Sequence, residues 1–203
     1  MRSPVEVPDW SKIPPPKDDG AARHLAGTRL PSLALPSTAG GTVDLAGLRG
    51  RMIVYAFPRT GRPDRANPVG WDLIPGARGC TPQSCAFRDH FAELKALGVG
   101  HLFGLSTQDT AYQQEAAARL HLPFPLLSDA AGKLTSALSL PTMEVEGVTL
   151  LKRFTLVVEN GTIRHVFYPV FPPDRNAADV IAWITASGSP ASPALGGPRD
   201  SIP

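Results

Sequence analysis

The sequence predicts an α/β fold in which a mixed β-sheet carries helices on both faces. Three observations support this prediction: short β-rich runs alternate with amphipathic stretches, an Asn-Gly pair separates two later β-rich runs, and a last amphipathic stretch follows them. Alternating strands and helices place helices over both faces of a sheet, whereas a two-residue turn joins antiparallel strands. The sheet is therefore expected to contain both parallel and antiparallel strands.

The two ends of the chain differ in composition from its middle. Residues 1–20 contain five prolines and little apolar periodicity, and residues 186–203 are rich in Ala, Ser, Gly and Pro. Such segments bury too little apolar surface to offset the entropy lost on ordering. We therefore expect a flexible N-terminal arm at residues 1–20, one domain at residues 21–185 and a flexible tail at residues 186–203.

The first half of the domain begins with the longest apolar run of the chain, residues 52–57, which predicts a buried strand. A long loop with four prolines follows and ends at Gly79. Thr81 and Pro82 then have the pattern of an N-cap followed by proline at the first helical position, so that a helix is expected from here to about Gly98.

The second half continues the alternation of strands and helices. Asn160-Gly161 is typical of a tight hairpin, because both turn positions need a positive φ. Further strands are expected at residues 99–105 (weakened by Gly100 and Gly104), 124–127, 150–159 and 162–167, and further helices at about 107–120, 130–140 and 174–186.

Composition excludes several classes of function. The net charge is +2 and the basic residues are scattered, whereas nucleic-acid binding usually needs a basic cluster. The longest apolar run is far shorter than the roughly 20 residues of a membrane span. No secretory signal is visible and two cysteines cannot form a disulfide scaffold, so we expect a cytoplasmic protein.

Cys80 lies where a helix is expected to begin, and Cys85 lies five residues further on. The start of a helix presents unsatisfied N–H groups and the positive end of the helix dipole, which stabilise the nucleophilic thiolate. Cα atoms five residues apart in a helix are about 8.6 Å from each other, whereas a disulfide needs less than about 7 Å. The two cysteines could therefore pair only if the first helical turn unwinds.

Two other interpretations of these cysteines stay open at this point. Cysteine is often buried, so Cys85 could simply face the core. His90 follows at the same five-residue interval and raises the alternative of a zinc site, although ligands at this spacing match none of the usual zinc patterns.

The segment at residues 79–89, with the pattern Gly-Cys-Thr-x-x-x-Cys-x-Phe-Arg-Asp, resembles the active-site segment of peroxiredoxins of the PrxQ (bacterioferritin comigratory protein) type. The resemblance covers roughly residues 25–185. Three more motifs are similar to those of the family: residues 105–109 (Leu-Ser-Thr-Gln-Asp), residues 122–129 (Leu-Pro-Phe-Pro-Leu-Leu-Ser-Asp) and residues 153–155 (Arg-Phe-Thr).

This resemblance implies a thioredoxin-like fold and the reduction of hydrogen peroxide or organic hydroperoxides. It implies that Cys80 attacks the peroxide and becomes a sulfenic acid, and that Cys85 condenses with it to a disulfide. Thioredoxin or a similar dithiol would reduce that disulfide, and Arg153 would stabilise the thiolate and the charge on the peroxide oxygens. No metal or organic cofactor is expected, because sulfur carries the two electrons, and we expect a monomer or a weak homodimer.

The chain departs from the family in its active-site loop. The family has Pro-x-x-x-Thr-x-x-Cys, whereas Ala77 stands three residues before Cys80, and the strand-ending Pro58 lies 22 residues before it. The loop at residues 61–79 therefore contains an insertion, within which Trp71 either anchors the loop or covers the pocket. Thr60 is our candidate for the missing hydroxyl, with Thr81 as the less favoured alternative.

Three functions remain possible from the sequence. The first is a thiol peroxidase that uses Cys80 and Cys85. The second is a peroxide or redox sensor with the same chemistry, and the third is a thioredoxin-fold binding module that has lost catalysis, an alternative kept open by the missing threonine. A general disulfide oxidoreductase is disfavoured because no Cys-x-x-Cys is present.

Overall fold

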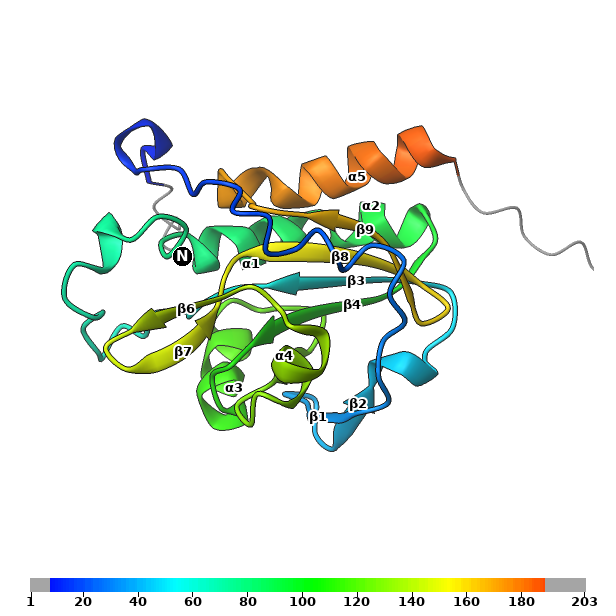
Figure 1. Cartoon of the computed structure of the whole chain (residues 1–203), viewed down its shortest axis with the longest axis horizontal. Coiled ribbons are helices and arrows are strands. Elements are labelled where there is room, and N and C mark those ends of the chain that lie inside the picture. The colour runs from blue at the N-terminus through cyan, green and yellow to red at the C-terminus, as the bar shows by residue number, and fades with distance from the viewer. Residues whose placement is uncertain (1–7, 189–203) are drawn as a thin grey trace, which may run out of the picture.

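The computed structural model describes residues 8–188, and its centre is a five-stranded sheet with the order β5-β4-β3-β8-β9 (Figure 1). Strands β3, β4 and β5 run parallel, whereas β8 is antiparallel to β3 and β9 is antiparallel to β8. The predicted mixed sheet is thus confirmed. The strands are β3 (Arg51–Ala56), β4 (Val99–Ser106), β5 (Leu126–Ser128), β8 (Phe154–Glu159) and β9 (Thr162–Phe167).

Strand β3 lies at the centre of the sheet, and all six of its residues are buried. Its side chains alternate between two apolar clusters: Ile53 and Tyr55 face one, whereas Met52 and Val54 face the other. A strand that is buried on both faces needs an uninterrupted apolar run. This is why the run at residues 52–57 predicts the strand correctly.

Helices cover both faces of this sheet (Figure 1). The cluster that contains Tyr55 is completed by α1, α2, α3 and α5, and the opposite cluster by α4. Within residues 8–188 no helix has the length and apolar character needed to cross a bilayer. The helices are α1 (Cys80–Asp89), α2 (Phe91–Ala96), α3 (Thr110–Arg119), α4 (Lys133–Leu138) and α5 (Asn176–Ser187), with short 3-10 turns η1 (Trp10–Lys12), η2 (Leu45–Gly47), η3 (Trp71–Leu73) and η4 (Pro173–Arg175).

Two predicted elements are divided in the structure. The helix expected up to Gly98 is interrupted at His90, which caps both α1 and α2. The strand expected at residues 150–159 is also two strands, because its first part pairs with a strand that we did not predict. These are β6 (Thr142–Val145) and β7 (Val148–Leu151), which form a separate hairpin, as do β1 (Ala34–Pro36) and β2 (Thr42–Asp44).

One turn and one strand contain a glycine for a physical reason that the structure shows. Asn160 and Gly161 both have positive φ, 49° and 77°, so the predicted β8–β9 hairpin is confirmed. At Gly104 in β4 a Cβ atom would lie 2.9 Å from the Tyr55 ring and 2.4 Å from Leu126, so only glycine fits. What looked like a weakness of this strand is therefore a requirement of packing.

Residues 8–20, the described part of the predicted arm, contact the domain in this structure. Asp19 accepts a hydrogen bond from Tyr168 and forms an ion pair with Lys152, and Ile13 is buried. These partners lie more than 130 residues away in sequence, so no local pattern revealed them. The remainder of the predicted arm and nearly all of the predicted tail lie outside the described residues.

Candidate active site

Cys80 is the first residue of α1, and Gly79 is its N-cap. This confirms that Cys80 stands at a helix start, but it corrects the predicted cap, because Thr81 and Pro82 lie inside the first turn. Gly79 has a φ of 105°, a conformation that glycine adopts without strain. Proline is tolerated in the first turn, because the N–H that it lacks has no partner within the helix.

Gly79→Ala is expected to destabilise the protein by about 2–4 kcal/mol, because the positive φ and a steric overlap both oppose a side chain here. The added Cβ would lie 2.5 Å from Pro173 and 2.8 Å from the Trp10 ring. Gly132, the cap of α4, also has a positive φ but no atom within 4 Å of such a Cβ. Gly132→Ala should therefore cost only about 1 kcal/mol. Equal losses in urea unfolding would contradict the overlap at Gly79.

Arg153 brings a positive charge to the sulfur of Cys80. Its Nη2 donates to Cys80 Sγ at 3.2 Å, and both side chains are almost fully buried. The same nitrogen faces the carbonyl oxygens of Gly76, Ala77 and Arg78 at 3.2–3.4 Å. The thiol in turn lies 3.6 Å from the Ala77 oxygen. The guanidinium therefore fixes the end of the loop and the sulfur in one place.

A buried polar network holds Arg153 in this position. Its Nη1 donates to Gln83 on α1, and Gln83 Nε2 donates to Asn176 Oδ1 on α5 at 2.9 Å. Thr155 Oγ1 donates to the same Asn176 oxygen at 2.6 Å. Our sequence reasoning missed Gln83 and Asn176, because a lone amide in a helix resembles a solvent-facing residue. Only their contact across 93 residues shows that they orient Arg153.

Cys80 opens onto a pocket of about 290 Å³ beside the start of α1. A pocket of this size lies at the lower end of the range for small-molecule sites. Its lining is predominantly polar and includes two arginines and one hydroxyl. The lining residues are Pro8, Arg59, Gly61, Asn67, Trp71, Asp72, Arg78, Gly79, Cys80, Thr81 and Pro82.

Cys85 lies inside the same helix and is 7% exposed. Burial raises the pKa of its thiol, and the nearby Arg88 opposes this only in part. Both cysteines are free thiols in this structure. Because residues 80–89 form one continuous helix, a bond between the two sulfurs requires the helix to open, as the sequence predicts.

Comparison with known proteins places the chain in a family. A family model described as Redoxin matches residues 25–181. The chain belongs to the redoxin family. A chloroplastic peroxiredoxin Q of rice (Oryza sativa subsp. japonica) is 30% identical over 157 residues, which are 76% of this chain and 64% of that protein. The chain thus spans less than two thirds of the rice protein. The chloroplastic peroxiredoxin Q of Gentiana triflora is 28% identical over 184 residues, 87% of this chain and 76% of that one.

Solved structures show the same fold. Peroxidoxin BcpB from Mycobacterium tuberculosis has a TM-score of 0.65 at 23% identity, covering 81% of this redoxin and 98% of that chain. Xanthomonas campestris peroxiredoxin Q has a TM-score of 0.62 at 22% identity, covering 79% and 97%. The thioredoxin-like fold is therefore confirmed, as is the resemblance to peroxiredoxins of the PrxQ type.

The structure does not bring Thr60 of this redoxin to the Cys80 pocket. Thr60 is 1% exposed, its N–H and hydroxyl both donate to Gln108 Oε1, and its carbonyl accepts from the Tyr112 hydroxyl at 3.0 Å. The hydroxyl that lines the pocket belongs to Thr81, the alternative we favoured less. The geometry thus favours Thr81 over Thr60 beside the sulfur.

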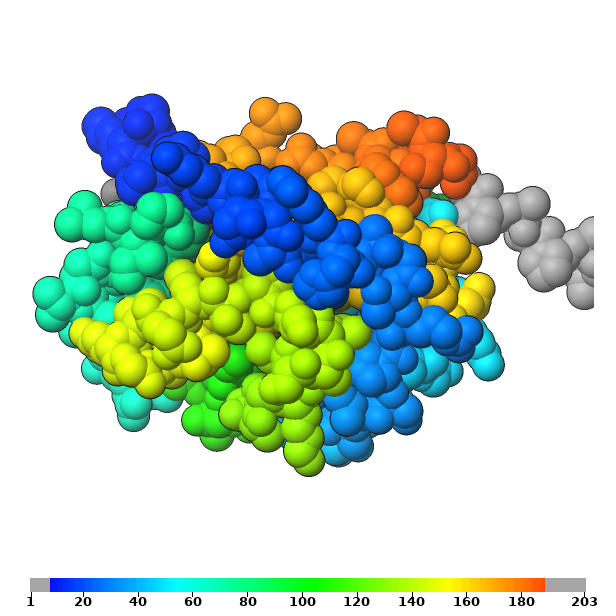
Figure 2. All heavy atoms as spheres, viewed as in Figure 1, coloured from blue at the N-terminus to red at the C-terminus, as the bar shows by residue number. Residues whose placement is uncertain are grey.

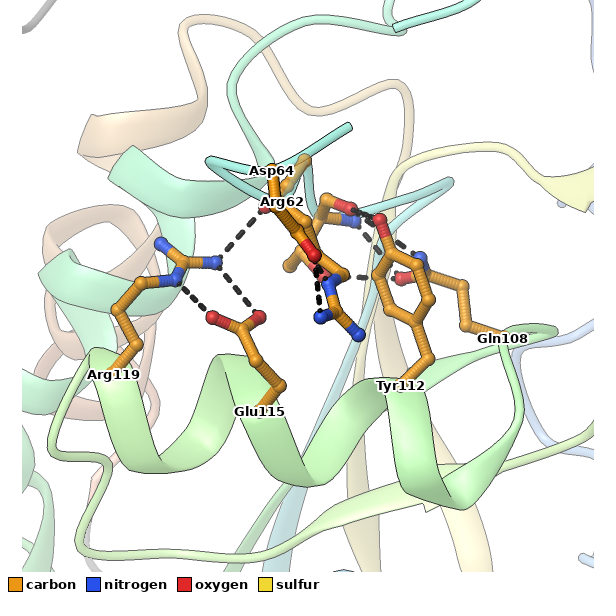
Figure 3. Close-up of polar contacts among 8 residues, drawn as sticks. Arg62, Asp64, Gln108, Tyr112, Glu115 and Arg119 are labelled. Carbon is orange, nitrogen blue, oxygen red and sulfur yellow. Dashed lines mark hydrogen bonds and ion pairs between the residues drawn. The ribbon is translucent and has the colours of Figure 1, made fainter. Parts of the chain in front are cut away.

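The contacts of Thr60 belong to a larger network that holds the start of the loop on α3 (Figure 3). Arg119 bridges Glu115 and the Gly61 carbonyl, and Arg62 pairs with Asp64. The Arg62 guanidinium also lies 5.5 Å from the ring centroid of Tyr112. The loop is therefore fixed at its start by α3 and at its end by Arg153.

Trp71 contacts both the inserted loop's support and the pocket. It is 5% exposed and packs with Val145 and Leu150 of the β6–β7 hairpin, so it anchors the inserted loop. It also lines the Cys80 pocket. The zinc alternative is not supported: within residues 8–188 no three Cys, His, Asp or Glu side chains lie together as metal ligands, and His90 instead contacts Glu93.

Proposed function

We propose that this redoxin is a thiol peroxidase that reduces hydrogen peroxide or organic hydroperoxides. The observation that carries the proposal is the 3.2 Å contact between Arg153 Nη2 and Cys80 Sγ, at the start of a helix and on the wall of a pocket. Both the guanidinium and the helix dipole favour a negative charge on this sulfur. Its relatives named peroxiredoxin Q support the same chemistry.

In the first step the Cys80 thiolate attacks one peroxide oxygen and breaks the O–O bond. Sulfur gains that oxygen as a sulfenic acid, and the other oxygen leaves as an alkoxide or hydroxide that takes up a proton. Arg153, which the buried Gln83 holds in place, stabilises the charge that develops on the peroxide oxygens. Thr81 is the hydroxyl in the position to hydrogen-bond the peroxide.

In the second step Cys85 gives up its proton and, as the thiolate, attacks the sulfenic sulfur of Cys80. The S–S bond forms as water leaves, after the first turn of α1 has opened. A dithiol such as thioredoxin then reduces the disulfide by thiol–disulfide exchange and is itself oxidised. Each cycle therefore transfers two electrons from the dithiol to one peroxide molecule.

Turnover with thioredoxin, thioredoxin reductase and NADPH tests this proposal. NADPH oxidation that depends on both peroxide and the redoxin is the expected result. A single turnover that no dithiol regenerates would instead favour the peroxide sensor. Failure to react with peroxide at all would leave only the binding module.

Disulfide formation is expected to accelerate as the pH rises. Burial in α1 raises the pKa of Cys85 above the value of about 8.5 for an exposed thiol. Below about pH 8.5 the Cys85 thiol is protonated in both the closed and the open helix, so the closed helix keeps its full stability. Between about pH 8.5 and the raised pKa of the closed state, the thiol of the open helix loses its proton first, so the closed helix loses stability. Below about pH 8.5 the rate instead follows the fraction of open-state Cys85 that is thiolate, the attacking form, so stopped-flow measurements on the sulfenic form should show a rate that rises about tenfold per pH unit up to about pH 8.5. A rate that is independent of pH between 6.5 and 9 would contradict this account.

A further inference from the structure

The segment at residues 8–20, which we call the N-terminal strap, lies across the outside of the domain. Figures 1 and 2 show it as the dark blue segment that runs from beside the inserted loop along the upper face of the molecule. It precedes the region that the redoxin model matches, which begins at residue 25. The matched family region therefore gives no role for the strap, and its contacts in this chain are the evidence for one.

Two contacts hold the C-terminal half of the strap. Asp19 pairs with Lys152 at 2.5 Å and accepts from the Tyr168 hydroxyl at 2.7 Å. Pro16 lies against Gly76, at 3.5 Å from where a Cβ would stand. Both contacts lie next to the active site, because Lys152 precedes Arg153 in sequence and the Gly76 carbonyl faces the Arg153 guanidinium.

The N-terminal half of the strap covers the start of α1. The Trp10 ring packs edge-on against Phe171, with 6.0 Å between the centroids. Its Cη2 lies so close to the helix cap that a Cβ on Gly79 would be 2.8 Å away, and Pro173 lies 2.5 Å from the same point. Pro8 continues onto the wall of the Cys80 pocket. Trp10 and Pro173 therefore pack together against the cap of the catalytic helix.

This packing opposes the movement that the second step needs. The Cys80–Cys85 bond forms only after the first turn of α1 unwinds, and moving Gly79 and Cys80 out of the helix disrupts the packing of Trp10 against the cap. The free energy of opening therefore includes the loss of the Trp10 contacts. The attack of Cys80 on peroxide, in contrast, takes place with the helix closed.

We propose that the strap is a positioning element, with Trp10 as its principal residue, that keeps α1 closed and so slows disulfide formation relative to the first step. This inference rests on the proposed peroxidase function. While the helix stays closed, a second peroxide competes with Cys85 for the sulfenic acid of Cys80. That second reaction transfers another oxygen to sulfur, releases water or an alcohol, and gives a sulfinic acid. The strap thus sets the peroxide concentration at which the enzyme is inactivated.

Trp10→Ala tests the inference, with Trp183→Ala as the matched control. Trp183 lies on α5 and stacks on His165 at 4.8 Å, away from the cap of α1. Rapid quenching and mass spectrometry of the full chain give the rates of sulfenic acid and disulfide formation separately. We expect Trp10→Ala to form the disulfide about fivefold faster, the size of effect that one aromatic edge contact supports. We also expect its sulfenic acid to form within about twofold of the wild-type rate, its sulfinic fraction in excess peroxide to fall, and Trp183→Ala to behave as the wild type.

Asp19→Asn is an independent test of the inference, because it releases the other end of the strap and leaves Trp10 in place. It should change disulfide formation in the same direction, and it decides the question if Trp10→Ala does not fold. Unchanged or slower disulfide formation would overturn the inference, as would an equal change in both steps. A wild-type protein that forms no sulfenic acid with peroxide would overturn the proposed function instead, so the two failures are distinguishable.

Discussion

A Cys80→Ser variant is expected to reduce no peroxide, with a second-order rate constant at least about a thousandfold below that of the wild type. A serine hydroxyl in the same place is not ionised at neutral pH, and its oxygen cannot donate two electrons to the peroxide as sulfur does. The Arg153 contact and the polar pocket remain in this variant, but they have no nucleophile to act on. The measurement is peroxide consumption under single-turnover conditions.

Cys85→Ser is the companion to this variant, because it removes the other thiol of the same helix. It should still consume one equivalent of peroxide and then stop, with Cys80 left as sulfenic or sulfinic acid. If Cys85→Ser lost the first reaction and Cys80→Ser retained it, the two cysteines would have been assigned in the wrong order.

Arg153→Gln is expected to lower the rate of sulfenic acid formation by about 10²–10³-fold, the loss typical of removing a donor that stabilises developing charge. Glutamine can still donate a hydrogen bond, but it carries no charge. The loss should appear in the reaction with peroxide, whereas disulfide formation from the sulfenic form should change much less. Stopped-flow kinetics of both steps separate the two effects.

Two variants control for the removal of a buried guanidinium. Arg164→Gln, on the neighbouring strand β9, removes a half-exposed arginine and should leave both rates unchanged. Arg153→Lys keeps the charge but cannot contact both Gln83 and the loop carbonyls, so it should react at an intermediate rate. Full activity in Arg153→Gln would show that this charge does not act on the sulfur or the peroxide.

The sequence predicted elements whose signal is local. The apolar run at residues 52–57 identifies β3 because a strand covered on both faces needs such a run. Asn160-Gly161 identifies the β8–β9 turn because both residues adopt positive φ. The β6–β7 turn carried a comparable signal in Glu146 and Gly147, whose φ values are 50° and 75°, and it was missed because Glu-Gly is a less frequent turn pair than Asn-Gly.

The site was only partly predictable, for a physical reason. Cys80 and Cys85 are identified by their spacing at a helix start, and Arg153 by its resemblance to a family motif. The packing of the strap and of the inserted loop depends instead on contacts between distant segments, such as Asp19 with Lys152 and Trp71 with Leu150. A proline-rich composition contains no information about such partners. For this reason the sequence alone indicated a flexible arm.

The central claim is that Cys80 and Cys85 act together on peroxide, and the mass of the intact protein after one equivalent of hydrogen peroxide tests it most directly. The account predicts that the wild type loses two hydrogen atoms through the Cys80–Cys85 disulfide, and that Cys85→Ser gains one oxygen atom on Cys80. Unchanged masses for both proteins would contradict it.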